Sequence, residues 1–287
     1  MEQSKKKRLS CNILVVFLVG ALLFILGSLA GSVLTYFTIG LFHVRDYGIW
    51  IIGSYLPFIG IGALILIYTR ITRKDIFHLY FRGSRGNNLK MAGLGLLTGF
   101  GMNGACILVA FLHGDVRLGV GSISPLWLVI AFLVVFIQSA TEELLVRGYL
   151  FYHIRERYGV PLALVLSSLL FSVLHISNDG VTVLALINIA AIGLFYALSV
   201  QYLDSLWFAM ANHAMWNFTQ NLIFGLPNSG LSADASLFAP VSARSSLCYD
   251  ASFGVEASLP ATVICLAGAA AVVLWVRKKQ SAKIAAV

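Results

Sequence analysis

Eight apolar segments separated by short polar connections constrain this chain more than any other feature. The hydrocarbon core of a bilayer is about 30 Å thick, and an α-helix crosses it in about 20 residues. Hydrophobic residues make up 59% of the chain and charged residues 11%, whereas about a quarter of a soluble domain is charged. We therefore predict an all-α, polytopic membrane protein with a bundle of eight transmembrane helices. The segments cover residues 11–42, 49–69, 91–112, 125–150, 161–177, 181–200, 205–224 and 259–276.

The distribution of Lys and Arg predicts how the bundle is oriented. If both termini are cytoplasmic, 16 of the 20 Lys and Arg lie in cytoplasmic segments, three lie in outer loops, and Arg147 lies within a span. This asymmetry follows the positive-inside rule. We expect a multi-pass protein of the cell membrane with cytoplasmic N- and C-termini. The basic residues form short clusters rather than one face, so no nucleic-acid partner is expected.

The spans are expected to form one structural unit, because no internal repeat or second domain is apparent. We expect a basic cytoplasmic tail at residues 1–10, a single transmembrane bundle at 11–276 and a second basic cytoplasmic tail at 277–287. The first apolar run is longer than the core of a secretory signal, so we expect it to remain as a helix. Residues 227–258 are the one long connection, which we call the outer loop.

Three charged residues in the fourth span need a partner or a function. Glu142, Glu143 and Arg147 follow an unbroken apolar run at residues 126–137, and an intramembrane charge costs roughly 2.5–3.5 kcal/mol on insertion scales. Glu143 and Arg147 have the favourable i,i+4 order for an ion pair, which we expect to support the local geometry. Glu142 points about 100° away on a helix and has no such partner. It is the candidate for chemistry.

A chain reversal is expected to bring a histidine to the depth of Glu142. Glu142 lies 17 residues before Gly159, and His175 lies 16 residues after it. If both arms stay helical, the carboxylate and the imidazole reach the same depth on neighbouring antiparallel helices. His213 and Asn217 are i,i+4 on the seventh span and share one face. A helix bundle can direct such side chains to a common site.

These four residues are compatible with two kinds of chemistry. Glu142 and His175 could hold a water, with Glu142 as general base, while His213 and Asn217 stabilise the oxyanion formed on an amide carbonyl. Alternatively, Glu142, His175 and His213 could hold a divalent metal such as zinc. There is no H-E-x-x-H motif, and the four cysteines form no C-x-x-C motif. The residues alone leave the cofactor undecided between none and a divalent metal.

Three ordered motifs resemble the CPBP family of intramembrane proteases, which includes the type II CAAX prenyl endopeptidases and the bacteriocin-processing or immunity (Abi) proteins. The motifs are E-E-x-x-x-R at residues 142–147, F-x-x-x-H at 171–175 and H-x-x-x-N at 213–217. The similarity extends over about residues 127–225. The stretches F-G-L-P-N-S-G-L-S and S-F-G-V-E-A in and beside the outer loop look like those of bacterial members.

The resemblance implies an eight-helix bundle with a conical, membrane-embedded, cytoplasm-facing cavity, a protease core at about residues 125–225 and a peptidase activity of the glutamic or metallo type. We favour the metal-free mechanism slightly, because a carboxylate and an imidazole suffice to bind a water. The expected substrate is a membrane-associated peptide or protein segment rather than a prenylated C-a-a-X protein. The roles implied for the matching residues are water activation for Glu142 and His175, oxyanion stabilisation for His213 and Asn217, and support of the site for Glu143 and Arg147.

Two functions of other kinds stay open. A non-enzymatic bacteriocin immunity or membrane scaffold protein would bind its partner through the outer loop or helix surfaces, and substitution of Glu142 would then be silent. A transporter is disfavoured, because the polar residues cluster in one place instead of lining a path on both sides.

Overall fold

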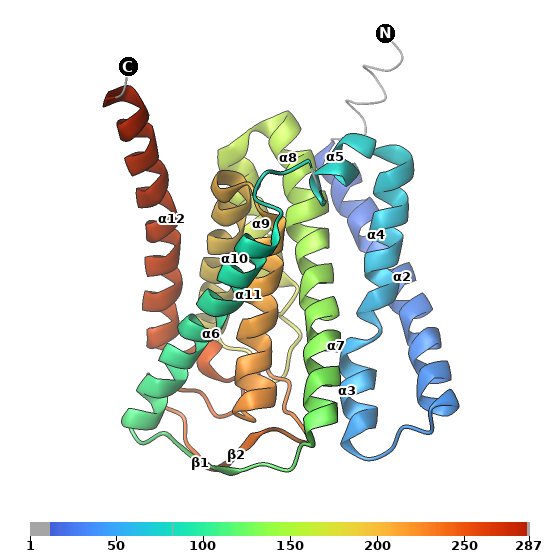
Figure 1. Ribbon diagram of the computed structural model, residues 1–287, viewed down its shortest axis with the longest axis vertical. Coiled ribbons are helices and arrows are strands. Elements are labelled where there is room, and N and C mark those ends of the chain that lie inside the picture. Colours follow the sequence, from blue (N-terminus) through green and yellow to red (C-terminus); the bar gives the residue numbers. More distant parts are fainter. Residues whose placement is uncertain (1–11, 82, 286–287) are drawn as a thin grey trace.

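The computed structural model describes residues 12–81 and 83–285 as a bundle of long helices (Figure 1). The predicted tail at residues 1–10 lies outside this range. The helices are α2 (Ile13–Leu41), α3 (Tyr47–Tyr55), α4 (Phe58–Thr72), α5 (Lys74–Leu79), α6 (Leu89–Leu112), α7 (Pro125–Glu143), the π-helix η1 (Leu144–Leu150), α8 (Phe151–Tyr158), α9 (Val160–Val173), α10 (Val183–Leu203), α11 (Leu206–Phe218), the π-helix η2 (Thr219–Ile223), the 3-10 helix η3 (Val255–Ala257) and α12 (Leu259–Ala285).

The predicted polytopic helical architecture is confirmed, with a difference in how many helices span the bilayer. All eight apolar segments are helical over most of their described length. Six helical stretches in the described part of the chain are long and apolar enough to cross a membrane. They are Ile13–Leu41, Tyr47–Thr72, Leu89–Leu112, Pro125–Tyr158, Val183–Leu203 and Leu259–Lys278. The other two segments give the short helix α9 and the more polar helix α11.

Helix α9 is too short to cross a bilayer. Its 14 residues span about 21 Å at 1.5 Å per residue. The chain then turns through residues 174–182 before α10 begins. This turn contacts the outer loop, where Asn178 Nδ2 donates to the Ser229 carbonyl at 2.8 Å.

Helix α11 can carry polar residues because protein surrounds it. It packs against α6, α7 and α10, and its residues from Phe208 to Ala214 are all buried. A helix enclosed in this way does not present a face to lipid, so it can carry His213 and Asn217 toward the interior of the bundle.

Two helices depart from the predicted boundaries. The second span is divided into α3 and α4 around Pro57, which lacks the N–H needed to continue a helix. The predicted C-terminal tail is instead helical through Ala285 as the end of α12.

A small antiparallel sheet, which the sequence did not predict, closes one end of the bundle. Strand β1 (Val116–Val120) pairs with β2 (Phe238–Ala243), and the register shifts between Arg117 and Leu118. The sheet ties the outer loop to the α6–α7 connection. It lies at the end of the bundle opposite the start of α2 and the end of α12 (Figure 1).

Candidate active site

The two adjacent carboxylates lie where α7 changes into a π-helix. Glu143 is the last residue of α7, and η1 follows directly. Single π-turns inside helices occur frequently at functional sites. The Glu143 side chain is fully buried, whereas the Glu142 side chain is 17% exposed. The two carboxylates therefore face different surroundings, as the 100° rotation between neighbours predicts.

Arg147 joins three helices inside the bundle. Its Nη1 lies 2.8 Å from Glu143 Oε1, which is the predicted i,i+4 ion pair, and its Nη2 donates to the Gly193 carbonyl at 3.0 Å. The guanidinium lies 4.3 Å from the ring centroid of Phe171 and 5.4 Å from that of Tyr196. Both charged side chains are fully buried. Removing either partner would leave a buried charge without compensation.

His213 lies between the two carboxylates. Its Nδ1 is 3.2 Å from Glu143 Oε1, and its Nε2 is 3.8 Å from Glu142 Oε2. A carboxylate accepts hydrogen bonds, so the bond to Glu143 places a proton on Nδ1 and directs Nε2 toward Glu142. The imidazole stacks on Tyr196 with 5.4 Å between ring centroids.

His175 lies in the turn that follows α9. We expected both arms of the reversal to stay helical as far as Glu142 and His175, but α9 ends at Val173. The His175 Nδ1 donates to the Phe171 carbonyl at 2.8 Å. Its Nε2 is therefore left for other partners, and the residue still lines the same cavity as Glu142.

Asn217 is held by a chain of side-chain amides. Its Nδ2 lies 3.3 Å from both Gln138 Oε1 and Ser139 Oγ, and its Oδ1 accepts from Asn228 Nδ2 at 3.3 Å. The Gln138 Nε2 in turn donates to Glu142 Oε1. Gln138 thus connects Glu142 with Asn217. It was not among the predicted site residues, although its i,i+4 spacing to Glu142 was visible in the sequence.

A second buried carboxylate in the site, Glu256, was also missed. It comes from η3, within the outer loop, and accepts hydrogen bonds from Trp216 Nε1 at 3.1 Å, Gln220 Nε2 at 2.7 Å and Asn228 Nδ2 at 2.8 Å. The backbone N–H of Ser229 lies 3.3 Å from its Oε2. Both S-F-G-V-E-A and F-G-L-P-N-S-G-L-S contribute to this contact, so these two stretches meet at the site.

Four of the six predicted site residues, all except Glu143 and Arg147, line one cavity of about 570 Å³ together with Gln138 and Glu256. Its side wall is apolar and includes Phe24, Phe58, Leu145, Ile189 and Ile192. The buried Glu142 Oε2 has no hydrogen-bond partner in the protein. Because buried polar atoms are rarely left unpaired, this oxygen marks the position where a ligand would bind. The polar lining consists mainly of Gln138, Glu142, His175, His213, Asn217 and Glu256.

The cavity opens at the end of the bundle opposite the start of α2 and the end of α12. Its exposed lining residues include Leu174 and Asp179 in the α9–α10 turn and Leu231 in the outer loop. Cytoplasmic termini and a cytoplasm-facing cavity were both expected. In this fold the cavity opening and the termini lie at opposite ends, so the two expectations exclude each other.

Comparison with protein families finds one match in this region. The family model for the Type II CAAX prenyl endopeptidase Rce1-like proteins matches residues 124–219. This part of the chain is similar to that family. No curated protein and no solved structure matches the chain. The Rce1-like region begins just before α7 and ends at the first residue of η2. It contains all six predicted site residues, whereas Asn228 and Glu256 lie outside it.

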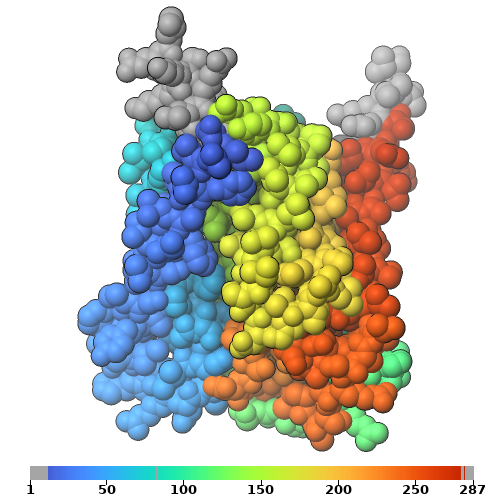
Figure 2. Space-filling model, turned by 180° about the vertical axis from the view of Figure 1, so that it is seen from behind, coloured from blue at the N-terminus to red at the C-terminus, as the bar shows by residue number. Residues whose placement is uncertain are grey.

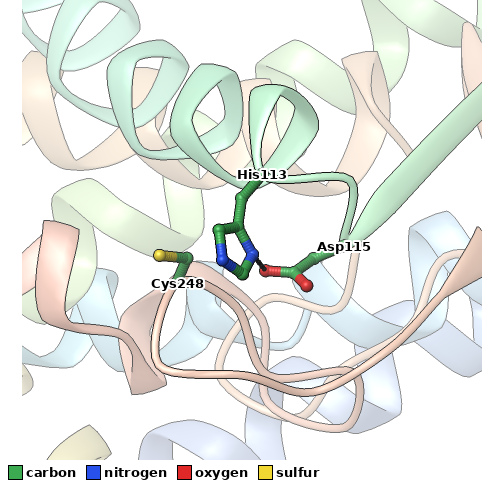
Figure 3. Close-up of side chains that lie close together, drawn as sticks. All are labelled: His113, Asp115 and Cys248. Carbon is green, nitrogen blue, oxygen red and sulfur yellow. Dashed lines mark hydrogen bonds and ion pairs between the residues drawn. The ribbon is translucent and has the colours of Figure 1, made fainter.

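In the part of the chain that the structure describes, the group suited to a metal ion lies outside the Rce1-like region. His113, Asp115 and Cys248 bring one ligand atom each within 4.8 Å of one another (Figure 3). Asp115 already accepts hydrogen bonds from His113 Nδ1 at 2.9 Å, Ser246 Oγ at 2.5 Å and Arg244 Nε at 3.1 Å. Its carboxylate therefore serves to fasten the outer loop to the end of α6.

The predicted metal ligands of the Rce1-like region do not form such a group. Glu142, His175 and His213 line one cavity, but the three are not among the described residues whose ligand atoms converge within 4.8 Å. Both imidazoles present Nε2, as metal-bound histidines often do, yet the spacing does not fit a shared ion. The arrangement instead suits a molecule held between Glu142 and the imidazoles.

Proposed function

We propose that the chain is an intramembrane endopeptidase that hydrolyses a peptide bond in a membrane-associated protein or peptide. The observation that carries this proposal is the Glu142 Oε2. It is buried, it has no hydrogen-bond partner in the protein, and it faces His213 Nε2 across 3.8 Å. The match of residues 124–219 to a family of endopeptidases supports a hydrolase. The apolar wall of the cavity supports a substrate that is itself embedded in the bilayer.

Glu142 is the general base in this mechanism. The hydrogen bond from Gln138 engages Oε1 and leaves Oε2 to accept a proton from a water that His175 Nε2 also holds. As the water oxygen attacks the peptide carbonyl, its proton passes to Glu142. Glu142 then returns the proton to the amide nitrogen, and the C–N bond breaks.

His213 and Asn217 stabilise the oxyanion. The Nδ1–H of His213 donates to Glu143, so Nε2 donates to the oxyanion when it carries the second proton of the imidazolium. Asn217 Nδ2 makes two bonds of 3.3 Å, which lie beyond the usual range for N–H···O bonds. The carbonyl oxygen of a substrate can replace these two acceptors, so that Asn217 Nδ2 donates to the oxygen on which negative charge develops.

The proposal is tested with purified protein in nanodiscs and a set of quenched-fluorescent peptides, some with a membrane-spanning segment and some ending in a prenylated C-a-a-X sequence. Glu142→Gln keeps the shape of the side chain and removes the base, so we expect the cleavage rate to fall by about 10²–10⁴. The matched control is Asp46→Asn, the same chemical change at an exposed loop residue.

Cleavage at equal rates by wild type and Glu142→Gln would refute the mechanism. If wild type binds a peptide of this set and cleaves none, the non-enzymatic immunity or scaffold function is the better account. If a prenylated peptide is cleaved faster than the membrane-spanning peptides, the preferred substrate is a prenylated C-a-a-X sequence, as the name of the matching family indicates.

A metal-free mechanism also predicts the response to chelators. We expect 1,10-phenanthroline and EDTA to leave the cleavage rate unchanged, because the water is held by Glu142 and His175. Loss of activity that added zinc restores would show instead that Glu142, His175 and His213 move together around an ion.

A further inference from the structure

We propose that substrates enter the cavity sideways from the outer half of the membrane, and that they are exported, membrane-anchored peptide segments. This inference rests on the proposed endopeptidase function. It concerns where the cavity opens, what lines the opening and which side of the membrane that opening faces.

The opening is built from connections at one end of the bundle. The α9–α10 turn contributes residues 177–179 to the lining, and the outer loop contributes residues 228–231. Asn178 Nδ2 donates to the Ser229 carbonyl at 2.8 Å, which holds the two segments together. Within the described residues, no lining residue comes from the α4–α6, α8–α9 or α10–α11 connections at the other end. A substrate therefore has access from one end.

The side wall next to this opening consists of α2, α3 and α4. Phe24, Ser54 and Phe58 line the cavity and are half-buried. The α9–α10 turn lies on the other side of the opening. Figure 2 looks onto this side of the molecule, where α2 and α3 in blue lie beside the yellow α9–α10 turn. The apolar wall suits a peptide coming from lipid, and the polar rim suits the peptide backbone where it leaves the bilayer.

The charges of the protein indicate which side of the membrane the opening faces. Cytoplasmic segments carry an excess of Lys and Arg. The connections at the closed end carry most of the described basic residues, and those at the open end carry three. A C-a-a-X protein presented from the cytoplasm would meet the closed end. The residues at the closed end are Arg70, Arg73, Lys74, Arg85, Lys90, Arg155, Arg157, Arg277 and Lys278, and those at the open end are Arg45, Arg117 and Arg244.

The orientation is tested by labelling with a membrane-impermeant maleimide on intact cells. The background carries Cys11→Ser and Cys248→Ser, and it keeps the buried Cys106 and Cys265. Ser177→Cys places a thiol at the rim of the opening, and Ser281→Cys places one at the opposite end; both serines are exposed. We expect Ser177→Cys to be labelled in intact cells and Ser281→Cys only after permeabilisation. The reverse pattern would overturn the proposal.

The route is tested in nanodiscs with the same two variants, before and after reaction with a bulky polyethylene glycol maleimide. We expect modification at position 177 to lower cleavage of a membrane-spanning peptide at least tenfold and modification at position 281 to have no effect. If modification at both positions is without effect while Glu142→Gln still abolishes cleavage, the entry route is wrong and the endopeptidase function stands. If the unmodified variants and wild type all fail to cleave, the function itself fails, and the claim about substrates falls with it.

Discussion

Glu142 and Glu143 show how adjacent identical residues acquire different roles from their surroundings. Glu143 is fully buried and bonds to Arg147 and His213 through one oxygen. Its role is to fix the positions of these two side chains. Glu142 bonds to Gln138 through Oε1, whereas its Oε2 has no hydrogen-bond partner in the protein and lies 3.8 Å from His213 Nε2. A single residue therefore carries the proton transfer in the proposed mechanism, and its neighbour holds the site in place.

Glu256 is expected to act through Asn228 and Asn217 rather than on the substrate. Glu256→Gln keeps the shape but turns an amide N–H₂ toward groups that donate, including Asn228 Nδ2. We expect kcat to fall about tenfold, equal to ~1.4 kcal/mol, with KM nearly unchanged. The measurement is steady-state cleavage of the best peptide from the nanodisc assay.

A double-mutant comparison separates this positioning role from general destabilisation. If Glu256 works through Asn228, adding Asn228→Ala to Glu256→Gln lowers kcat by less than the sum of the two separate effects. Fully additive effects, or a loss of kcat that tracks a lower Tm, would contradict the role.

The sequence revealed much of the site because its main residues follow helical spacing. The pairs Glu143 with Arg147 and His213 with Asn217 are both i,i+4, and a helix places such residues on one face. Gln138 has the same spacing to Glu142 and could have been found in the same way. Asn228 and Glu256 could not, because they reach the cavity through non-helical segments whose path depends on tertiary packing.

At the scale of elements, counting residues along ideal helices predicted which residues share a cavity better than it predicted where the helices end. The equal-depth argument brought Glu142 and His175 to one cavity, but α9 ends before His175. The Ser172 hydroxyl donates to the Leu186 carbonyl at 2.7 Å, a contact with α10 that no sequence pattern indicates. A residue count at 3.6 residues per turn likewise cannot predict the π-helical turn after Glu143.

The packing of α2 on α4 depends on glycines and gives a prediction for one helix. A Cβ on Gly27 of α2 would collide with the backbone of Ile61 in α4, and a Cβ on Gly31 would collide with the backbone of Pro57 just before α4. Small residues allow this close approach between membrane helices. We expect Gly31→Leu to destabilise the protein by about 1–3 kcal/mol. The matched control is Gly40→Leu on the same helix, where a Cβ meets nothing within 4 Å.

Thermal unfolding in nanodiscs measures both variants. We expect a lower Tm for Gly31→Leu and no change for Gly40→Leu. Because α2 forms part of the cavity wall, Gly31→Leu should also lower the cleavage rate. An unchanged Tm for Gly31→Leu would show that α2 does not need this close contact.

For the whole molecule, the outer loop is a structural part of the bundle rather than a flexible connection. The β1–β2 sheet and the Asp115 cluster fasten it to the end of α6, and Asn188 Nδ2 donates to the carbonyls of Glu256 and Ser258 at 2.8 Å each. The sequence predicted the helical bundle from its apolar segments. It did not predict the docked loop, because the loop is held by contacts between residues far apart in the sequence, such as Asp115 and Arg244.

The Asp115 cluster predicts how acid affects the outer loop. Burial alone would raise the pKa of Asp115, but hydrogen bonds from Ser246 and His113 and the charge of Arg244 outweigh it and lower the pKa. A carboxylate with a lowered pKa stabilises the folded state above its unfolded pKa of about 3.9, and this contribution is lost as the pH falls through the folded value.

We therefore expect the protection of β2 amides against hydrogen exchange, relative to the intrinsic rate at each pH, to fall below about pH 4 in wild type. In Asp115→Asn the β2 amides should already be less protected at pH 7. Their protection should show no additional loss near pH 4, because the Asp115 carboxylate is absent. An equal acid response in the two proteins would show that Asp115 does not fasten the loop.

In the proposed mechanism, this membrane bundle cleaves peptide bonds with Glu142 as the base. Terminal-peptide mass spectrometry on membranes from cells with equal levels of wild type or Glu142→Gln can detect that cleavage. We expect new peptide ends that occur only with wild type, in segments on the outer side of the membrane. Identical sets of peptide ends, under conditions where wild type gives a phenotype, would contradict it.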